Sequence, residues 1–113
     1  MARVLISEPH EDVEALLRLV VVRLGHDPVG PEGDAVDAAV IEPCVGDGLR
    51  LARTLRARNV PLLFTSIYPP TFEALELEPA AYLVKPFPLS AIQRALEAVL
   101  TGKGLSAAGG RSD

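Results

Sequence analysis

Several features that often reveal a protein's class are scarce in this chain of 113 residues. It has a single cysteine, Cys44, so no disulfide can form within it, and Met1 to Ile6 runs into an apolar stretch without the pattern of a signal peptide. The longest apolar stretch, Leu16 to Leu24, contains two arginines and is too short to span a bilayer. These absences predict a cytoplasmic protein without a membrane segment.

Charge and length narrow the class further. The formal net charge is −4, and no cluster of lysine and arginine is dense enough for a nucleic-acid footprint, so direct nucleic-acid binding is not expected. The two histidines, His10 and His26, lack the spacing of a metal site, and the segment from Ser7 to His10 contains no glycine that could form a phosphate loop. The length suits one domain with a proper core.

Four short apolar runs each end in a polar residue. Continuous apolar runs are typical of strands buried on both faces of a parallel sheet, and ligand sites in such sheets lie beyond the carboxyl ends of the strands. The polar residues that follow the runs would therefore converge, although polar residues also end strands wherever strands meet water. The runs begin at Val4, Ala38, Leu62 and Ala80, and the residues that follow them are Glu8, Glu42, Ser66 and Lys85.

Helical periodicity appears between the apolar runs. Three segments each have one apolar helical face: residues 11 to 24, Leu49 to Arg58, and Pro88 to Leu100. Thr71 to Leu77 could form a short helix capped by Thr71. Residues 30 to 34 are too rich in glycine and proline for a long helix. The tail, residues 101 to 113, has no apolar pattern and is expected to be a flexible tail or linker stub. The side chains expected to face inward are Val13, Leu16, Leu17, Val20, Val21 and Leu24 in the first helix, Leu51, Ala52 and Leu55 in the second, and Leu89, Ile92, Leu96 and Val99 in the last.

A basic stripe is expected on the outer face of the helix between Leu49 and Arg58. It is formed by Arg50, Arg53 and Arg56, which follow one another at three-residue spacing. Such a stripe can be a solvated face or a partner-binding patch, and the sequence leaves both open.

The order of these elements and the motif from Tyr82 to Phe87 resemble the receiver domain of two-component response regulators, and the resemblance covers Arg3 to Leu100. It implies a receiver domain over residues 1 to 100 with a flavodoxin-like, doubly wound α/β fold. Its five-stranded parallel sheet would have the order 2-1-3-4-5. The segment from Gly25 to Glu42 is shorter than usual in the family, so the second helix is expected to be reduced or missing.

The resemblance assigns roles to particular residues. In the family the first strand ends in two acids that hold Mg²⁺, the third in an aspartate that a histidine kinase phosphorylates, and the fourth in a serine or threonine. A lysine with a cis bond to proline pairs with the phosphoryl group, and an aromatic residue three positions earlier acts as a rotamer switch. Here Glu8 matches the first acid, Ser66 the hydroxyl position, Tyr82 the switch, and Lys85 and Pro86 the lysine and proline.

Two positions depart from the family's pattern. Pro9 replaces the second acid and offers no side-chain oxygen, so Mg²⁺ binding should be weak and no other cofactor is implied. Glu42 replaces the phosphorylated aspartate and is one methylene longer, so its carboxylate should reach Lys85 and form an ion pair. That pair could mimic phosphorylation, but only in part, because it brings one negative charge instead of nearly two. Alternatively, it could be a structural pair in a retired site.

The sequence therefore predicts an atypical receiver domain in phosphorelay signal transduction. It would act as a protein-interaction module without normal aspartyl phosphorylation, would not be an enzyme, and would have no catalytic residue of its own. The alternatives are a functional receiver phosphorylated by a histidine kinase, and a small flavodoxin-like enzyme or nucleotide binder. The expected partner is a histidine kinase or another protein. A homodimer could form through the segments 71–77, 80–84 and 88–100.

Overall fold

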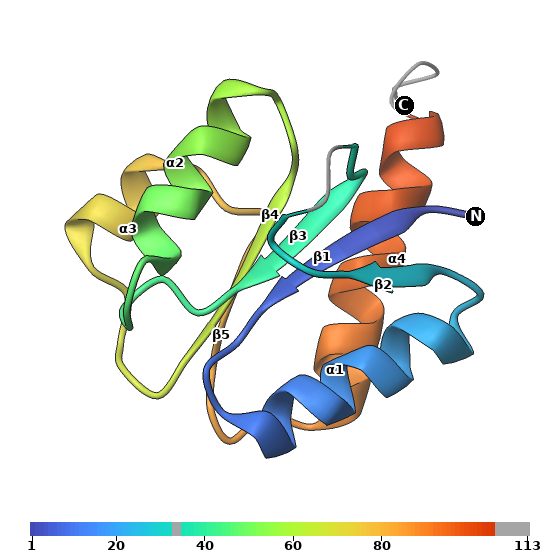
Figure 1. Ribbon diagram of the computed structural model, residues 1–113, viewed down its shortest axis with the longest axis horizontal. Helices are drawn as coiled ribbons and strands as arrows, with labels where there is room; N and C mark the ends of the chain where they lie inside the picture. The colour runs from blue at the N-terminus through green and yellow to red at the C-terminus, as the bar shows by residue number, and fades with distance from the viewer. Residues whose placement is uncertain (33–34, 106–113) are drawn as a thin grey trace.

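The computed structural model describes residues 1–32 and 35–105 and contains a five-stranded parallel sheet (Figure 1). The strand order is β2-β1-β3-β4-β5, and each neighbouring pair is parallel, as the sequence predicts for a doubly wound flavodoxin-like fold. The strands are β1 (Arg3–Ser7), β2 (Asp27–Val29), β3 (Ala38–Ile41), β4 (Leu62–Ser66) and β5 (Ala81–Val84).

Helices cover both faces of the sheet. Figure 1 shows α1 and α4 on one side and α2 and α3 on the other. In the described part of the connection between β2 and β3 there is no helix, which confirms that the second helix of the family's pattern is missing. The helices are α1 (Glu11–Arg23), α2 (Gly48–Ala57), α3 (Phe72–Glu76) and α4 (Leu89–Leu105).

The two helical layers create two hydrophobic cores, one on each face of the sheet. Alternate residues of a strand point to opposite faces, so Val4 and Ile6 pack on the α1 and α4 side while Leu5 packs on the other. The middle strands β3 and β4 are buried along their whole lengths. This double burial explains why their sequences read as continuous apolar runs instead of alternating ones.

The structure corrects several sequence expectations about the helices. Leu16 and Leu89 were expected to face inward but are each 44% exposed, whereas Leu17, Val20 and Val21 are buried as expected. The apolar arc of α1 is therefore wider than the surface that the sheet and α4 cover. The last helix was expected to end at Leu100, but it continues to Leu105. The rest of the expected tail, residues 106–113, lies outside the described residues.

Thr71 and Arg56 make the contacts that anchor α2 and α3 on their face of the sheet. Thr71 caps α3 as predicted, because its Oγ1 accepts a hydrogen bond of 3.1 Å from the Ala74 amide. Arg56 was expected in a basic stripe on the outer face of its helix, but its Nε donates to the carbonyl of Leu77 at 3.0 Å and its Nη2 pairs with Glu78 at 2.8 Å. Arg56 therefore ties α2 to the end of α3, and only Arg50 and Arg53 remain exposed members of that stripe.

The start of α2 fits closely against the chain that leaves β3. A Cβ atom added at Gly48 would overlap the backbone carbonyl oxygen of Glu42. Glycine at this position therefore allows the helix to begin directly beside Glu42, and the packing fixes the backbone at the end of β3. Within the described residues, no helix is both long and apolar enough to cross a membrane.

Candidate functional site

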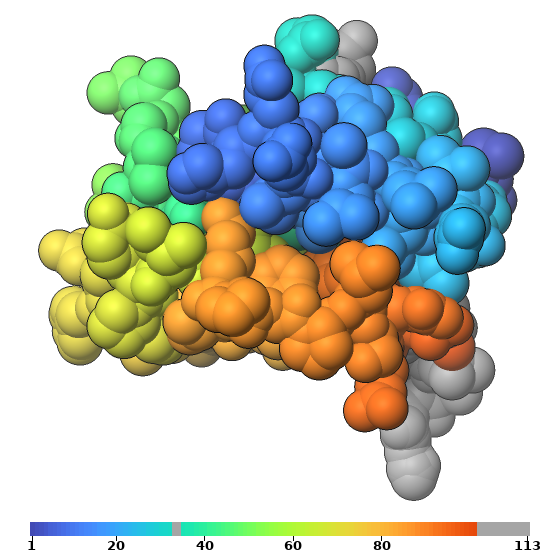
Figure 2. All heavy atoms as spheres, turned by 90° about the horizontal axis from the view of Figure 1, so that it is seen from below, coloured from blue at the N-terminus to red at the C-terminus, as the bar shows by residue number. Residues whose placement is uncertain are grey.

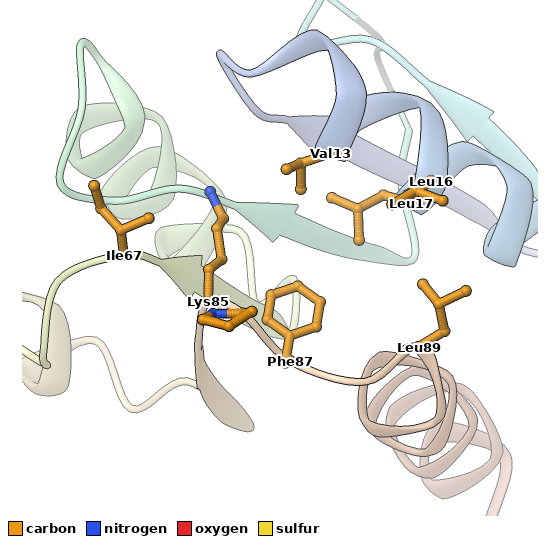
Figure 3. A pocket seen from close by; sticks show the side chains of 8 residues that line it. Val13, Leu16, Leu17, Ile67, Lys85, Phe87 and Leu89 are labelled. Atoms are coloured by element: carbon orange, nitrogen blue, oxygen red, sulfur yellow. The ribbon is translucent and has the colours of Figure 1, made fainter.

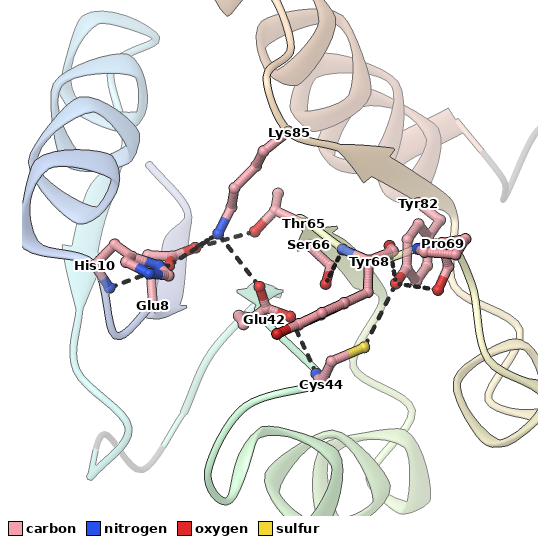
Figure 4. A network of polar contacts seen from close by, with 10 residues as sticks. All are labelled: Glu8, His10, Glu42, Cys44, Thr65, Ser66, Tyr68, Pro69, Tyr82 and Lys85. Atoms are coloured by element: carbon pink, nitrogen blue, oxygen red, sulfur yellow. Dashed lines mark hydrogen bonds and ion pairs between the residues drawn. The ribbon is translucent and has the colours of Figure 1, made fainter.

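Lys85 follows the last residue of β5 and extends the strand's hydrogen bonding by one position. Its amide donates to the carbonyl of Ser66 at 2.7 Å, and its peptide bond to Pro86 is cis, as the resemblance predicts. The side chain reaches across the carboxyl end of the sheet toward the residues that follow β1 and β3 (Figure 4). Three strands therefore contribute to one site, as parallel-sheet topology requires.

The Lys85 ammonium lies between two carboxylates. Its Nζ is 2.8 Å from Glu8 Oε1 and 3.0 Å from Glu8 Oε2, and it is 3.3 Å from Glu42 Oε1. The side chain of Lys85 is 9% exposed, and both glutamate side chains are fully buried. The expected pair between Glu42 and Lys85 is confirmed, but the shorter contact is the one to Glu8.

Glu8 has further partners on its own side of the site. His10 contacts Glu8 Oε2 through its amide at 3.2 Å and through Nδ1 at 3.0 Å. Thr65 donates from Oγ1 to Glu8 Oε1 at 3.3 Å and is completely buried. The sequence analysis did not identify Thr65. Its position one residue before the end of β4 could have indicated it, because adjacent strand residues point to opposite faces.

Glu42 is held at both carboxylate oxygens. Oε1 faces Lys85, and Oε2 accepts a hydrogen bond of 3.1 Å from the amide of Cys44. The loop after β3 thus returns a backbone donor to the carboxylate that it follows. Cys44 itself is partly buried.

Ser66 and Tyr82 lie on the other face of the sheet from Thr65. Ser66 is buried, and its Oγ accepts a hydrogen bond of 3.1 Å from the amide of Tyr68, so it fixes the start of the loop after β4. The Tyr82 ring packs edge-on against Phe64, with 6.1 Å between the ring centroids and 87° between the planes. The structure brings Ser66 near the site and joins its carbonyl to the Lys85 amide, but in the part of the chain described no hydrogen bond joins the two side chains.

The Tyr82 hydroxyl contacts the loop between β4 and α3. It lies 3.0 Å from the carbonyl of Tyr68, 3.2 Å from that of Pro69, and 3.6 Å from the sulfur of Cys44. Burial and, to a smaller extent, the neighbouring Cys44 thiol raise the pKa of Tyr82 to about 12, although a hydrogen bond with Ser66 acts in the opposite direction. These contacts hold the half-buried ring against the sheet and connect it, through Cys44, to Glu42.

A magnesium ion is implied by the resemblance, but the residues present do not fit one. Mg²⁺ needs near-octahedral oxygen ligands at roughly 2.0–2.1 Å. The Lys85 ammonium already lies between the two carboxylates that would bridge the ion, and Pro9 supplies no side-chain oxygen. Among the residues that the structure describes, no group of three or more histidine, cysteine, aspartate or glutamate side chains could hold a metal.

Two hollows flank the ion pairs. One, of about 560 Å³, borders the carboxylates and is lined by Glu8, Pro9, Glu42, Asp47 and Gly48, among others. The other, of about 390 Å³, is an apolar groove between α1 and the segment after β5 (Figure 3). Figure 2 shows the same face of the molecule, where α1 (blue) lies opposite the segment that follows β5 (orange). The side chains of the apolar groove include Val13, Leu16, Ile67, Phe87 and Leu89.

Replacement of Lys85 by methionine should lower the free energy of unfolding by about 3–5 kcal/mol, because it leaves two buried carboxylates without their cation. The double variant Lys85→Met with Glu42→Gln should lose less of the free energy of unfolding than Lys85→Met alone, since one of the two unpaired buried charges is removed. Urea melts of wild type, Lys85→Met, Glu42→Gln and the double variant measure the coupling. Strictly additive losses would contradict it.

Stability should fall as the pH rises from about 10 to about 12 because the folded state keeps Tyr82 neutral while the unfolded chain ionises it. Below pH 10 the contribution of Tyr82 to stability is fully present, and above pH 12 it is lost. Urea melts across this range should show a pH-dependent loss in wild type that is smaller in Tyr82→Phe. The same slope in both proteins would assign the loss to other groups.

Comparisons with known proteins were made at the level of sequence and of structure. No protein-family model matches the sequence, and no curated protein matches it. The signal receiver domain of a modulated diguanylate cyclase from Desulfovibrio desulfuricans has a similar structure, with a TM-score of 0.79 and 26% sequence identity. The match covers 94% of this chain and 98% of that one.

Two further solved structures have the same fold at lower identity. A two-component response regulator from Clostridium difficile has a TM-score of 0.77 at 19% identity, covering 89% of this chain and 97% of that one. A response regulator receiver protein from Pseudoalteromonas atlantica has a TM-score of 0.75 at 18% identity, with coverage of 89% and 98%. In its fold and in its strand order, the chain is therefore similar to receiver domains of the response-regulator type.

Proposed function

We propose that the chain is a regulatory module of two-component signal transduction that acts in the cytoplasm by binding another protein, without ordinary aspartyl phosphorylation. The observation that supports this most is the state of Glu42. It stands where the resemblance places the phosphoacceptor, its side chain is fully buried, and both of its oxygens are engaged.

Phosphoryl transfer to Glu42 would meet two obstacles. A carboxylate oxygen must be free to approach phosphorus in line with the leaving group, and a metal ion normally neutralises the charge that develops. Here one oxygen faces Lys85 at 3.3 Å and the other accepts from Cys44 at 3.1 Å. The ammonium that would bind an incoming phosphoryl group is already shared with Glu8 at 2.8 Å.

The buried pair of Glu42 and Lys85 also fixes the state of the rotamer switch that the resemblance assigns to Tyr82. An acyl phosphate carries nearly two negative charges and several acceptor oxygens, whereas Glu42 offers one charge and two oxygens. Tyr82 is nevertheless held in one position by Phe64 and by the loop after β4. We therefore assign Glu42 the role of a permanent substitute that keeps Lys85 and Tyr82 in one arrangement.

An exposed apolar surface supports protein binding as the output. Phe72 and Leu75 on α3 are 75% and 51% exposed, and Val84 at the end of β5 is 46% exposed. Monomers rarely leave large apolar side chains together in solvent unless they contact a partner. We propose that this surface, formed by α3, β5 and the adjoining side of α4, binds a histidine kinase, another protein of the pathway, or a second copy of the chain.

The proposal predicts that wild-type protein gains no phosphoryl group from a small phosphodonor such as acetyl phosphate in the presence of Mg²⁺. Intact-mass measurement gives the result directly. Pro9→Asp combined with Glu42→Asp restores the acids that the family's pattern requires, and is the positive control. A mass gain in wild type that is absent from Glu42→Gln would show instead that the chain is a functional receiver.

Self-association through the α3 and β5 surface should not need a phosphodonor. Sedimentation at rising concentration should show a concentration-dependent increase in mass for wild type, and Phe72→Glu should abolish it because a charge would be buried in the interface. Leu19→Glu, at a position on α1 that is 44% exposed, is the matched control and should associate as wild type does. Association that survives Phe72→Glu would place the contact elsewhere.

A further inference from the structure

We propose that α2 and α3 together form a self-complementary surface through which two copies of this chain associate, with the basic face of α2 in each copy lying on the acidic face of α3 in the other. The inference rests on the part of the proposed function that assigns partner binding to α3, and it names the partner as a second copy. It does not depend on whether Glu42 can accept a phosphoryl group.

The charged residues of α2 are all basic, and those of α3 are all acidic. No aspartate or glutamate occurs between Asp47 and Glu73, and no lysine or arginine occurs between Arg58 and Lys85. The formal net charge of the chain is −4, so the arginines of α2 form a basic surface on an otherwise acidic molecule. These arginines and the one that follows the helix are Arg50, Arg53, Arg56 and Arg58, and the glutamates of α3 and the segment after it are Glu73, Glu76 and Glu78.

The two sets of charges are only partly paired within one chain. Arg56 and Glu78 form an ion pair at 2.8 Å. Within residues 1–32 and 35–105, four other side chains of these sets are exposed and take part in no ion pair. They are Arg50, Arg53, Glu73 and Glu76. Two positive and two negative charges therefore stay available on neighbouring helices.

The two helices lie side by side on one face of the sheet, and buried residues of both belong to the same hydrophobic core (Figure 1). Each leaves one parallel strand and leads to the start of the next, so both helices run in the same direction. The pair of Arg56 and Glu78 marks a common level on them. Arg53 and Arg50 come three and six residues before Arg56, and the two preceding glutamates come two and five residues before Glu78. The two rows of charges therefore differ in level by about one residue, or roughly 1.5 Å along a helix.

A two-fold axis parallel to these helices would use this match. It would place α2 of each copy over α3 of the other and would leave the level of every residue along the helices unchanged. Arg50 would then face Glu73 of the second copy, and Arg53 would face Glu76. Because such an interface is isologous, each contact occurs twice, and guanidinium groups form strong paired hydrogen bonds with carboxylates.

Exposed apolar side chains on α3 supply the area that charges alone would lack. Phe72 and Leu75 are 75% and 51% exposed beside the two glutamates. On the facing helix, Thr54 and Ala57 are exposed between the arginines, whose aliphatic stems can cover an aromatic ring. Burial of Phe72 against α2 of the second copy would add affinity, while the charges would fix which helices meet.

Sedimentation of the full chain at rising concentration, at low and at high salt, tests the inference. Wild type should dimerise, and salt should weaken the dimer because it screens exposed charges. Arg50→Glu with Arg53→Glu should weaken self-association at least about tenfold, since like charges would then face each other, and Glu73→Arg with Glu76→Arg should do the same. An equimolar mixture of the two double variants should associate as wild type does, because every facing pair is again of opposite sign.

The matched control is Arg23→Glu with Arg94→Glu. It changes the net charge by the same amount at exposed positions of α1 and α4, on the opposite face of the sheet, and should associate as wild type does (Figure 1). Recovery in the mixture also shows that both double variants are folded. A monomeric wild type, a dimer insensitive to salt, or association that both double variants retain would overturn the inference. None of these results bears on phosphorylation, which the intact-mass measurement tests separately.

Discussion

The buried contact of one ammonium with two carboxylates is the interaction on which the carboxyl edge of this sheet depends. Taking charged groups out of water is costly, and the cost is offset only when each charge has a close partner. Lys85 meets this condition for both Glu8 and Glu42 because its long side chain extends from β5, an edge strand, past the end of β4 to β3 and β1. The ion pairs therefore require this strand order. In turn, they hold three separate strands at a common edge.

The departures from the usual receiver pattern are physically coupled. A longer side chain at Glu42 brings its carboxylate to Lys85, and the loop after β3 places the Cys44 amide on its second oxygen. Gly48 then lets α2 begin against the backbone of Glu42, where a larger residue would overlap it. Pro9 adds no carboxylate, so the charge at the edge stays close to what one lysine can neutralise.

Much of the architecture could be predicted from the sequence because strong local patterns coincide with the tertiary arrangement. The apolar runs predicted the strands, and the breakers between Gly30 and Gly33 predicted the missing helix. The finer contacts could not be predicted. Whether Thr65 or Ser66 faces Glu8 depends on strand register and twist, and Leu16 is exposed because α1 has more apolar surface than its neighbours cover. The last helix passes its expected end because glycine costs a helix only about 1 kcal/mol and does not forbid it.

A fixed charge at the acceptor position changes how a signal could enter such a domain. In a two-state switch, a ligand or modification shifts the balance only by as much as its interaction energy differs between the states. Under the proposed function Glu42 is not phosphorylated, so the addition of a phosphoryl group is not the event that selects a state. The Tyr82 ring is held between Phe64 and the loop after β4, beside the exposed surface of α3 and β5. Under that proposal, a change in that surface is driven by the binding energy of a partner that contacts it, and that energy must exceed the cost of rearranging a buried ion pair.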